Sequence, residues 1–173
     1  VGAFSTGSAQ ITAGTGCDEG GACREVSTVS GPELIEVVSD GAGTDTNSRL
    51  GASIVCAEFC RAALEFITRG RQIANFNSDT SDQWLDRIRD RIAYSAEQRD
   101  LVLRSFAATL VGAIIQDDVA VLVHVGDGAC VFRLAGQPDW MVASWPSHGE
   151  YASTTYFVTD DPQPNTKVSI FEG

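Results

Sequence analysis

At Glu36-Val37-Val38-Ser39-Asp40-Gly41-Ala42-Gly43, an apolar run that begins at Leu34 stops at an aspartate followed by two glycines in three positions. A helical pattern begins a few residues later, near Ser48. This order predicts a buried strand that carries one carboxylate into a turn suited to small residues. Two interpretations of the turn stay open. Asp40 and a neighbouring backbone carbonyl could hold a hard cation such as Mg²⁺, or Asp40 could be an ordinary turn and capping residue.

The length and composition indicate one soluble globular domain over residues 1–173. The chain is 43% hydrophobic and 20% charged, values typical of a domain with a sizeable core. No apolar run approaches the roughly 20 residues of a membrane span, and Val1–Ser5 lacks the basic start of a signal peptide. Because the chain lacks an initiator methionine, we expect a trimmed or partial start. A net charge of −11 argues against nucleic acid and anionic membranes as partners.

The five cysteines contain no C-x-x-C pair. Cys56 and Cys60 lie one helical turn apart in an apolar segment, and Cys130 lies in another, so we expect all three to be free thiols. Cys17 and Cys23 could form a bridge, but nothing else in the sequence is typical of a secreted protein, and we expect a cytoplasmic location. The two histidines lie far apart in the sequence, which argues against a histidine-based zinc site.

The hydrophobic period changes along the chain from strand to helix and back to strand. Strands are expected at residues 3–12, 26–29 and 34–39, helices near 48–67, 81–94 and 95–105, and then strands at 107–115, 119–125, 129–134, 140–142, 156–159 and 168–171. Hairpins join the later strands. This order predicts an α+β fold in which helices pack outside antiparallel sheets.

The glycine-rich segment at residues 13–25 has acidic residues in its middle. Its four glycines are typical of a flexible loop. A second interpretation is a loop that carries Asp18 and Glu19 to a metal ion. The residues alone do not decide between the two.

Four motifs, taken in order, resemble the metal-dependent serine/threonine protein phosphatases of type 2C, and within them a bacterial branch. The branch pattern G-T-S-H-I…C-Q-D is similar to residues 7–11 and 17–19, V-x-D-G-A-G to 37–43, A-x-T-L…G-D-G-a to 107–110 and 126–129, and G-E-Y-A-N-x-T to 149–155. The motifs are spread over nearly the whole chain.

The resemblance implies an αββα sandwich, in which helices flank two mainly antiparallel sheets and two Mg²⁺ or Mn²⁺ ions bind at one end. The ions share a bridging water or hydroxide that attacks the phosphorus of a phosphorylated protein, so no protein nucleophile is needed. Asp40 matches the carboxylate that bridges both ions, and Gly41 the residue whose carbonyl completes one shell. Asp18 and Glu19 fall where the family has its first acidic ligand. Asp127 matches a ligand of a third, weaker ion, or is a hairpin turn residue.

Two features depart from the family pattern. The family has a later D-G strand end and a final acidic pair, and neither has a counterpart before Gly173. Asp160 and Asp161 follow the G-E-Y-A motif too closely and are predicted to form a turn. Gln10 and Thr12 stand where many relatives have a phosphate-binding arginine. We therefore expect either an incomplete chain or a weakened site.

Three functions follow from the sequence. The first is a phosphoprotein phosphatase, whose partners would be a phosphorylated protein and a cognate serine/threonine kinase. The second is a catalytically weak or inactive module of the same fold that binds a kinase or a phosphorylated protein. The third is a small-molecule-binding sandwich with structural D-G turns, and the four motifs in order argue against it.

Overall fold

The computed structural model describes residues 19–28, 31–43, 46–116, 118–134, 136–147, 155–160 and 166–172, with side chains from residue 33 to 171 within those ranges. The strand expected at residues 3–12 lies outside these ranges, as does most of the G-E-Y-A motif. In the part of the chain that is described, no helix is long and apolar enough to cross a membrane.

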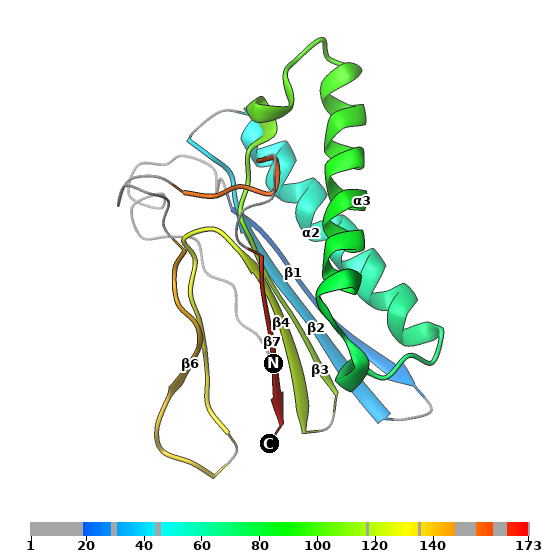
Figure 1. Ribbon diagram of the computed structural model, residues 1–173, viewed down its shortest axis with the longest axis vertical. Helices are drawn as coiled ribbons and strands as arrows, with labels where there is room; N and C mark the ends of the chain where they lie inside the picture. The colour runs from blue at the N-terminus through cyan, green and yellow to red at the C-terminus, as the bar shows by residue number, and fades with distance from the viewer. Residues whose placement is uncertain are drawn as a thin grey trace.

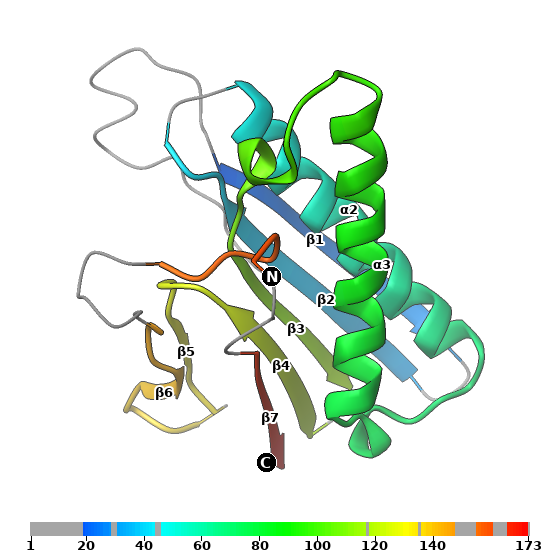
Figure 2. The same ribbon diagram turned by 45° about the horizontal axis from the view of Figure 1, so that its top comes forward.

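Five antiparallel strands form the main sheet, in the order β1-β2-β3-β4-β7 (Figure 2). Their bounds are β1 (Glu19–Thr28), β2 (Gly31–Asp40), β3 (Leu110–Gln116), β4 (Val119–Val125) and β7 (Lys167–Glu172). The central strands β2, β3 and β4 come from the apolar runs that predicted them. The expected location of the D-G turn, at the end of a strand inside the sheet, is therefore confirmed.

Two helices, α2 (Thr46–Thr68) and α3 (Ser78–Glu97), lie antiparallel on one face of this sheet (Figure 1). Between them is a short 3-10 helix, η1 (Ile73–Asn75). Asn77 caps α3 through its side-chain oxygen, which accepts a hydrogen bond from Thr80 N at 2.9 Å. Alternation along β2 turns Ile35 and Val37 toward the helices, and both are almost fully buried.

An aromatic cluster joins the two helices to each other. Trp84 packs edge-on against Phe59, Phe66 and Phe76, with ring centroids 5.6, 5.9 and 5.1 Å away. At the surface, Arg87 of α3 donates two hydrogen bonds to the Glu65 carboxylate of α2. The hydrogen bonds from Arg87 lower the pKa of Glu65, and Arg87 lies on the solvent-exposed side of its helix.

A second, smaller sheet lies on the face of the main sheet opposite the helices (Figure 1). It consists of β5 (Cys130–Phe132) and β6 (Met141–Ser144), which pair antiparallel. The ring of Phe132 lies 5.1 Å from that of Phe171 on β7, so the hairpin contacts the main sheet. The predicted arrangement of helices and two antiparallel sheets is confirmed, although in the described ranges helices cover only one face.

The structure corrects several element boundaries. The third helix expected at 95–105 does not form, because α3 continues to Glu97 and the chain then turns at Asp100, whose φ is +54°. Only a short 3-10 helix, η2 (Leu103–Phe106), follows. From Glu19 onward the glycine-rich segment is strand β1 rather than a loop. Residues 156–159 are a turn instead of a strand, closed by Asp160, whose carboxylate accepts from Phe157 N.

The three cysteines with described side chains form no disulfide, as predicted. Burial raises the pKa of the Cys56 thiol to about 12, and the neighbouring Cys60 adds to the shift. Burial also raises the pKa of Cys130, with a smaller contribution from the negative charge of Glu36. The thiols of Cys56 and Cys130 are therefore protonated at neutral pH, and Cys56 is part of the hydrophobic core.

We predict that Gly112 on β3 is required by the ring of Phe59. A Cβ at this position would overlap that ring, so Gly112→Ala is expected to destabilise the protein by about 1–3 kcal/mol. In a Phe59→Leu background the same change should cost less, because the shorter side chain leaves room. Urea denaturation of the four proteins gives the coupling energy.

Gly136→Ala is the matched control. Gly136 has φ +80°, and a Cβ added to it would meet no atom within 4 Å, so its cost is backbone strain alone. That cost should be the same with Phe or Leu at position 59. Additive effects for Gly112→Ala would contradict the steric explanation.

Candidate active site

The D-G turn after β2 is held against the segment before β3 by hydrogen bonds to the backbone and to the side chain of Thr109. Asp40 N donates to Thr109 Oγ1 at 3.0 Å, and Thr109 N donates to the Asp40 carbonyl at 2.9 Å. Ala42 N then donates to the Ala107 carbonyl at 2.8 Å. The motifs at 37–43 and 107–110, about seventy residues apart in the sequence, therefore meet at one edge of the sheet.

Gly41 is needed because the turn packs directly on the start of α2. A Cβ on Gly41 would lie 2.6 Å from the carbonyl carbon and oxygen of Ser48, which are backbone atoms of the helix. Ser48 itself is buried. The glycine thus allows the end of β2 and the first turn of α2 to come together.

The carboxylate of Asp40 lies on the face of the sheet opposite the helices. Along β2 the side chains of Ile35 and Val37 point to the helices, so those of Glu36, Val38 and Asp40 alternate to the other face. Asp40 is exposed at this strand end. Its position gives a carboxylate access to solvent while its backbone is fixed in the sheet.

Glu19 is directly opposite Asp40 in the pairing of β1 with β2. Residues opposite each other in an antiparallel pair are on the same face of the sheet, with Cα atoms about 4.5–5.5 Å apart. The register therefore brings together two of the residues predicted to bind metal. Asp18 lies outside the described residues.

Asp127 follows β4 in the turn Gly126-Asp127-Gly128. Gly126 has φ +115°, and a Cβ there would lie 2.7 Å from Cγ2 of Thr109, so this turn also packs on Thr109. The carboxylate of Asp127 accepts a hydrogen bond from Thr155 Oγ1 at 2.9 Å. Two strand spacings, roughly 10 Å, separate the ends of β2 and β4.

The donor set has the chemistry that Mg²⁺ and Mn²⁺ require. Asp40 and Asp127 offer exposed carboxylate oxygens, and the turn at Gly41 offers a backbone carbonyl, all of them hard ligands. Among the residues whose placement is described, no three Asp, Glu, His or Cys side chains come together as a complete metal centre. The oxygen ligands present are of the type that Mg²⁺ and Mn²⁺ bind. A complete coordination shell needs ligands beyond the residues that the structure describes.

His124 is a buried polar residue that the sequence did not single out. It lies on β4 three residues before Asp127, is 0% exposed, and its Nδ1 is 2.6 Å from Ser144 Oγ on β6. Burial lowers the pKa of His124, and the positive charge of Lys167, its partner on β7, lowers it further. A hydrogen bond with the Gly126 backbone and the negative charge of Asp127 raise it, but less strongly. In the sequence, a histidine inside the apolar run Val119–Val125 is the signal that could have identified this buried polar residue.

The family model described as Protein phosphatase 2C matches residues 6–173. The chain belongs to the protein phosphatase 2C family. The resemblance that the four motifs predicted is therefore confirmed.

Individual relatives agree with the family. The chain is 31% identical over 130 residues to serine/threonine-protein phosphatase 3 of Escherichia coli, a match that covers 75% of this chain and 50% of the relative. Among solved structures, it is similar in fold to the serine/threonine phosphatase Stp1 of Staphylococcus aureus, with a TM-score of 0.58 at 14% identity over 90% of this chain and 65% of that one. It is also similar to PppA, a regulatory component of the type VI secretion system of Pseudomonas aeruginosa, with a TM-score of 0.57 at 15% identity, over 89% and 72%.

These comparisons differ in what they establish. The chain spans about half the length of the Escherichia coli relative that it matches. The structural similarities have low sequence identity and show the fold alone. Within this protein phosphatase 2C fold, the structure places the predicted residues at the same end of the main sheet, where β1 begins and β2 and β4 end. They are Glu19, Asp40, Gly41 and Asp127.

We predict that His124 makes the stability of the folded chain fall as the pH falls. Its pKa is lower in the folded protein than the ordinary value of 6.5, so the unfolded chain takes up the proton first. The free energy of unfolding therefore decreases as the pH drops below about 6.5 and levels off below the folded pKa.

Urea unfolding at pH 7.5 and 5.5 tests this prediction when wild type is compared with His124→Asn. All other titrating groups are common to both proteins and cancel in the comparison. The variant should lose less stability between the two pH values than wild type. An equal loss would show that His124 titrates alike in both states.

Proposed function

We propose that this protein phosphatase 2C chain is part of an enzyme that hydrolyses phosphoserine and phosphothreonine in proteins, with Mg²⁺ or Mn²⁺ as cofactor. The observation that carries the proposal is the meeting of the Asp40 and Asp127 turns at one sheet edge, both packed on Thr109. Family membership and the name of the Escherichia coli relative support the same activity. Residues 1–173 would then belong to a single phosphatase domain.

Each candidate residue has a separate role in this proposal. Asp40 would contribute to two ions, the carbonyl of Gly41 would complete one shell, and Glu19 or Asp18 would supply a further carboxylate. Asp127 would hold a third ion more weakly. When bound, the ions supply the positive charge and the acidified water that phosphoryl transfer to water requires.

The chain itself contributes preorganisation. The backbone of Asp40 is fixed on both its N–H and its carbonyl by Thr109, so the carboxylate projects from a rigid strand end. The hydrogen bond from Thr155 orients the carboxylate of Asp127. Ligands held in place before the ions bind lose little conformational freedom on binding, which favours a charged and ordered site.

The partners follow from this activity. The substrate would be a phosphorylated protein, and a cognate serine/threonine kinase is a second candidate partner because it would produce that substrate. The net charge of −11 continues to argue against nucleic acid and anionic membranes. A cytoplasmic location is part of the proposal, because the cysteines with described side chains form no disulfide.

We predict that Asp40→Asn in the full-length protein lowers the hydrolysis of p-nitrophenyl phosphate by about 100-fold or more. The amide keeps the shape of the carboxylate but removes one negative charge from a site that binds hard cations by charge. EDTA should abolish wild-type activity, and added Mn²⁺ should restore it. Asp127→Asn should have a smaller effect, because its ion is the weaker one.

Asp86→Asn is the matched control, since Asp86 is an exposed aspartate on α3, away from the sheet edge. It should leave the rate unchanged. Equal rates for wild type and Asp40→Asn would rule out the proposed role of Asp40. A full-length protein that binds a phosphoprotein or kinase without hydrolysing any phosphate ester would instead be a non-catalytic module.

A further inference from the structure

The buried His124 has no role in the proposed reaction, although it lies three residues before Asp127. Its ring faces the β5–β6 hairpin, because Val121, Val123 and Val125 occupy the helix-facing positions of β4. Burying a polar ring that is 0% exposed costs free energy unless the ring makes hydrogen bonds. The hydrogen bonds of His124 therefore indicate its structural role.

One nitrogen of the ring makes a short bond and the other makes none. Nδ1 lies 2.6 Å from Ser144 Oγ, and Ser144 is itself buried. Nε2 has no hydrogen-bond partner among the residues that the structure describes. The short bond to Ser144 is therefore the main polar contact of the ring, and the Gly126 backbone acts on the same ring through its effect on the pKa.

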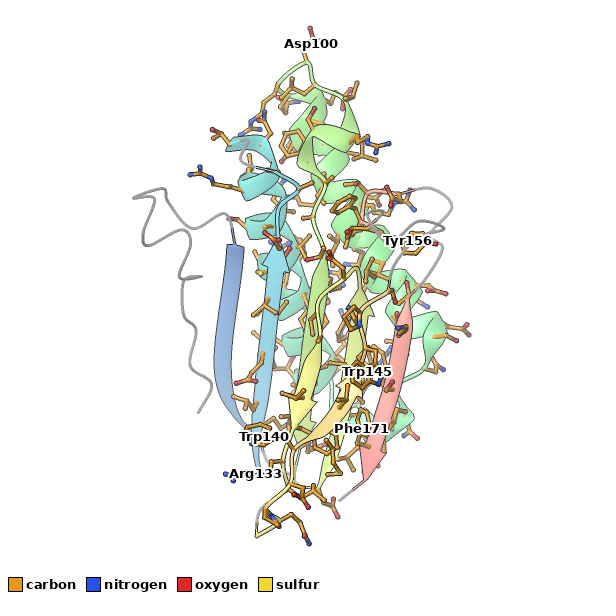
Figure 3. All side chains as sticks on the ribbon, turned by 90° about the vertical axis from the view of Figure 1, so that its left-hand side faces the viewer. Asp100, Arg133, Trp140, Trp145, Tyr156 and Phe171 are labelled. Atoms are coloured by element: carbon orange, nitrogen blue, oxygen red, sulfur yellow. The ribbon has the colours of Figure 1, made fainter. Side chains whose placement is uncertain are left out.

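Ser144 begins a short segment, Ser144–Ser147, that is fastened to the main sheet at three points. The first is the bond to His124. The second is Lys167 Nζ, which donates to the Trp145 carbonyl at 3.0 Å. The third is Ser147 N, which donates to the Gly126 carbonyl at 2.9 Å. Figure 3 shows Trp145 on the hairpin side of the sheet, beside β7.

The third point of attachment is in the turn that carries Asp127. Gly126 packs between the side chain of Thr109 and the carbonyl of Tyr156. The carbonyl of Gly126 accepts a hydrogen bond from Ser147 N. Asp127 is exposed, with a hydrogen bond from Thr155. The backbone before Asp127 is therefore positioned partly by the segment that His124 anchors.

We propose that His124 is a positioning residue for Asp127: its bond to Ser144 holds the segment Ser144–Ser147 against Gly126 and so fixes the turn that carries the Asp127 carboxylate. This inference rests on the proposed function, in which Asp127 binds a divalent ion. Residues that orient a metal ligand typically change metal affinity or activity by about 10- to 100-fold when they are lost.

Two amide variants separate positioning from simple filling of the core. The amide of His124→Asn lies near the place of Nδ1 and can keep the bond to Ser144. The amide of His124→Gln reaches toward the place of Nε2, which makes no bond in the described part of the chain. If the Nδ1 bond is what matters, the smaller side chain should function better than the larger one.

The test uses the full-length protein, with p-nitrophenyl phosphate as substrate and Mn²⁺ as the only divalent ion. We expect His124→Gln and Ser144→Ala to raise the Mn²⁺ concentration for half-maximal activity about tenfold, with little change in KM for the substrate. His124→Asn should stay within about threefold of wild type. Ser53→Ala removes an exposed serine hydrogen bond on α2, to the Arg49 carbonyl, and should have no effect.

Thermal melts and calorimetric titration with Mn²⁺ accompany the kinetics. An active wild type with an unchanged Mn²⁺ requirement in His124→Gln and Ser144→Ala would overturn the inference and leave the proposed function standing. Equal weakening by Asn and Gln, in proportion to lowered melting temperatures, would also overturn it, because His124 would then only fill space. A wild type that neither binds Mn²⁺ nor hydrolyses the ester would overturn the proposed function, and this inference with it.

Discussion

The pairing of Asp40 with Thr109 is the contact on which the candidate site depends. Three elements meet there: Thr109 bonds to the backbone of Asp40, Ser39 Oγ donates to the Thr109 carbonyl at 2.6 Å, and the Gly126 turn rests on the Thr109 side chain. Thr109 and Ser39 are both buried, so the bond between them is shielded from competition with water. One threonine therefore contacts both the strand end that carries Asp40 and the turn that carries Asp127.

Much of this arrangement could be predicted from the sequence because it is encoded locally. The apolar run that ends at Asp40 predicted β2, and the helical periods predicted α2 and the first part of α3. The motifs also predicted which turns carry the acidic residues. The register that puts Glu19 opposite Asp40 was not predictable, since pairing between strands depends on contacts that no single segment contains.

The features that differ from the expectation have two physical causes. The helix expected at 95–105 does not form, because Asp100 adopts a positive φ and Leu101 N bonds back to the Ala96 carbonyl, which ends the helical path. Glycines suggested a loop before Glu25, yet pairing with β2 holds that segment as a strand. His124 is one polar residue in an apolar run, and its partner Ser144 is twenty residues away, so no local pattern marks the pair. The helix end is a local backbone turn, whereas in the other two cases a tertiary contact overrode a local preference.

The two carboxylates differ in how the fold constrains them, and this difference bears on their proposed affinities. Asp40 ends a strand in the interior of the sheet, and both of its backbone polar groups are bonded to Thr109. Asp127 lies in a turn, and its position depends on bonds from Thr155 and, through Gly126, from Ser147. A ligand on a turn loses more freedom when an ion binds than a ligand on a paired strand. The weaker ion would therefore be expected at Asp127 for conformational reasons alone, and contacts that restrain its turn would matter more there than at Asp40.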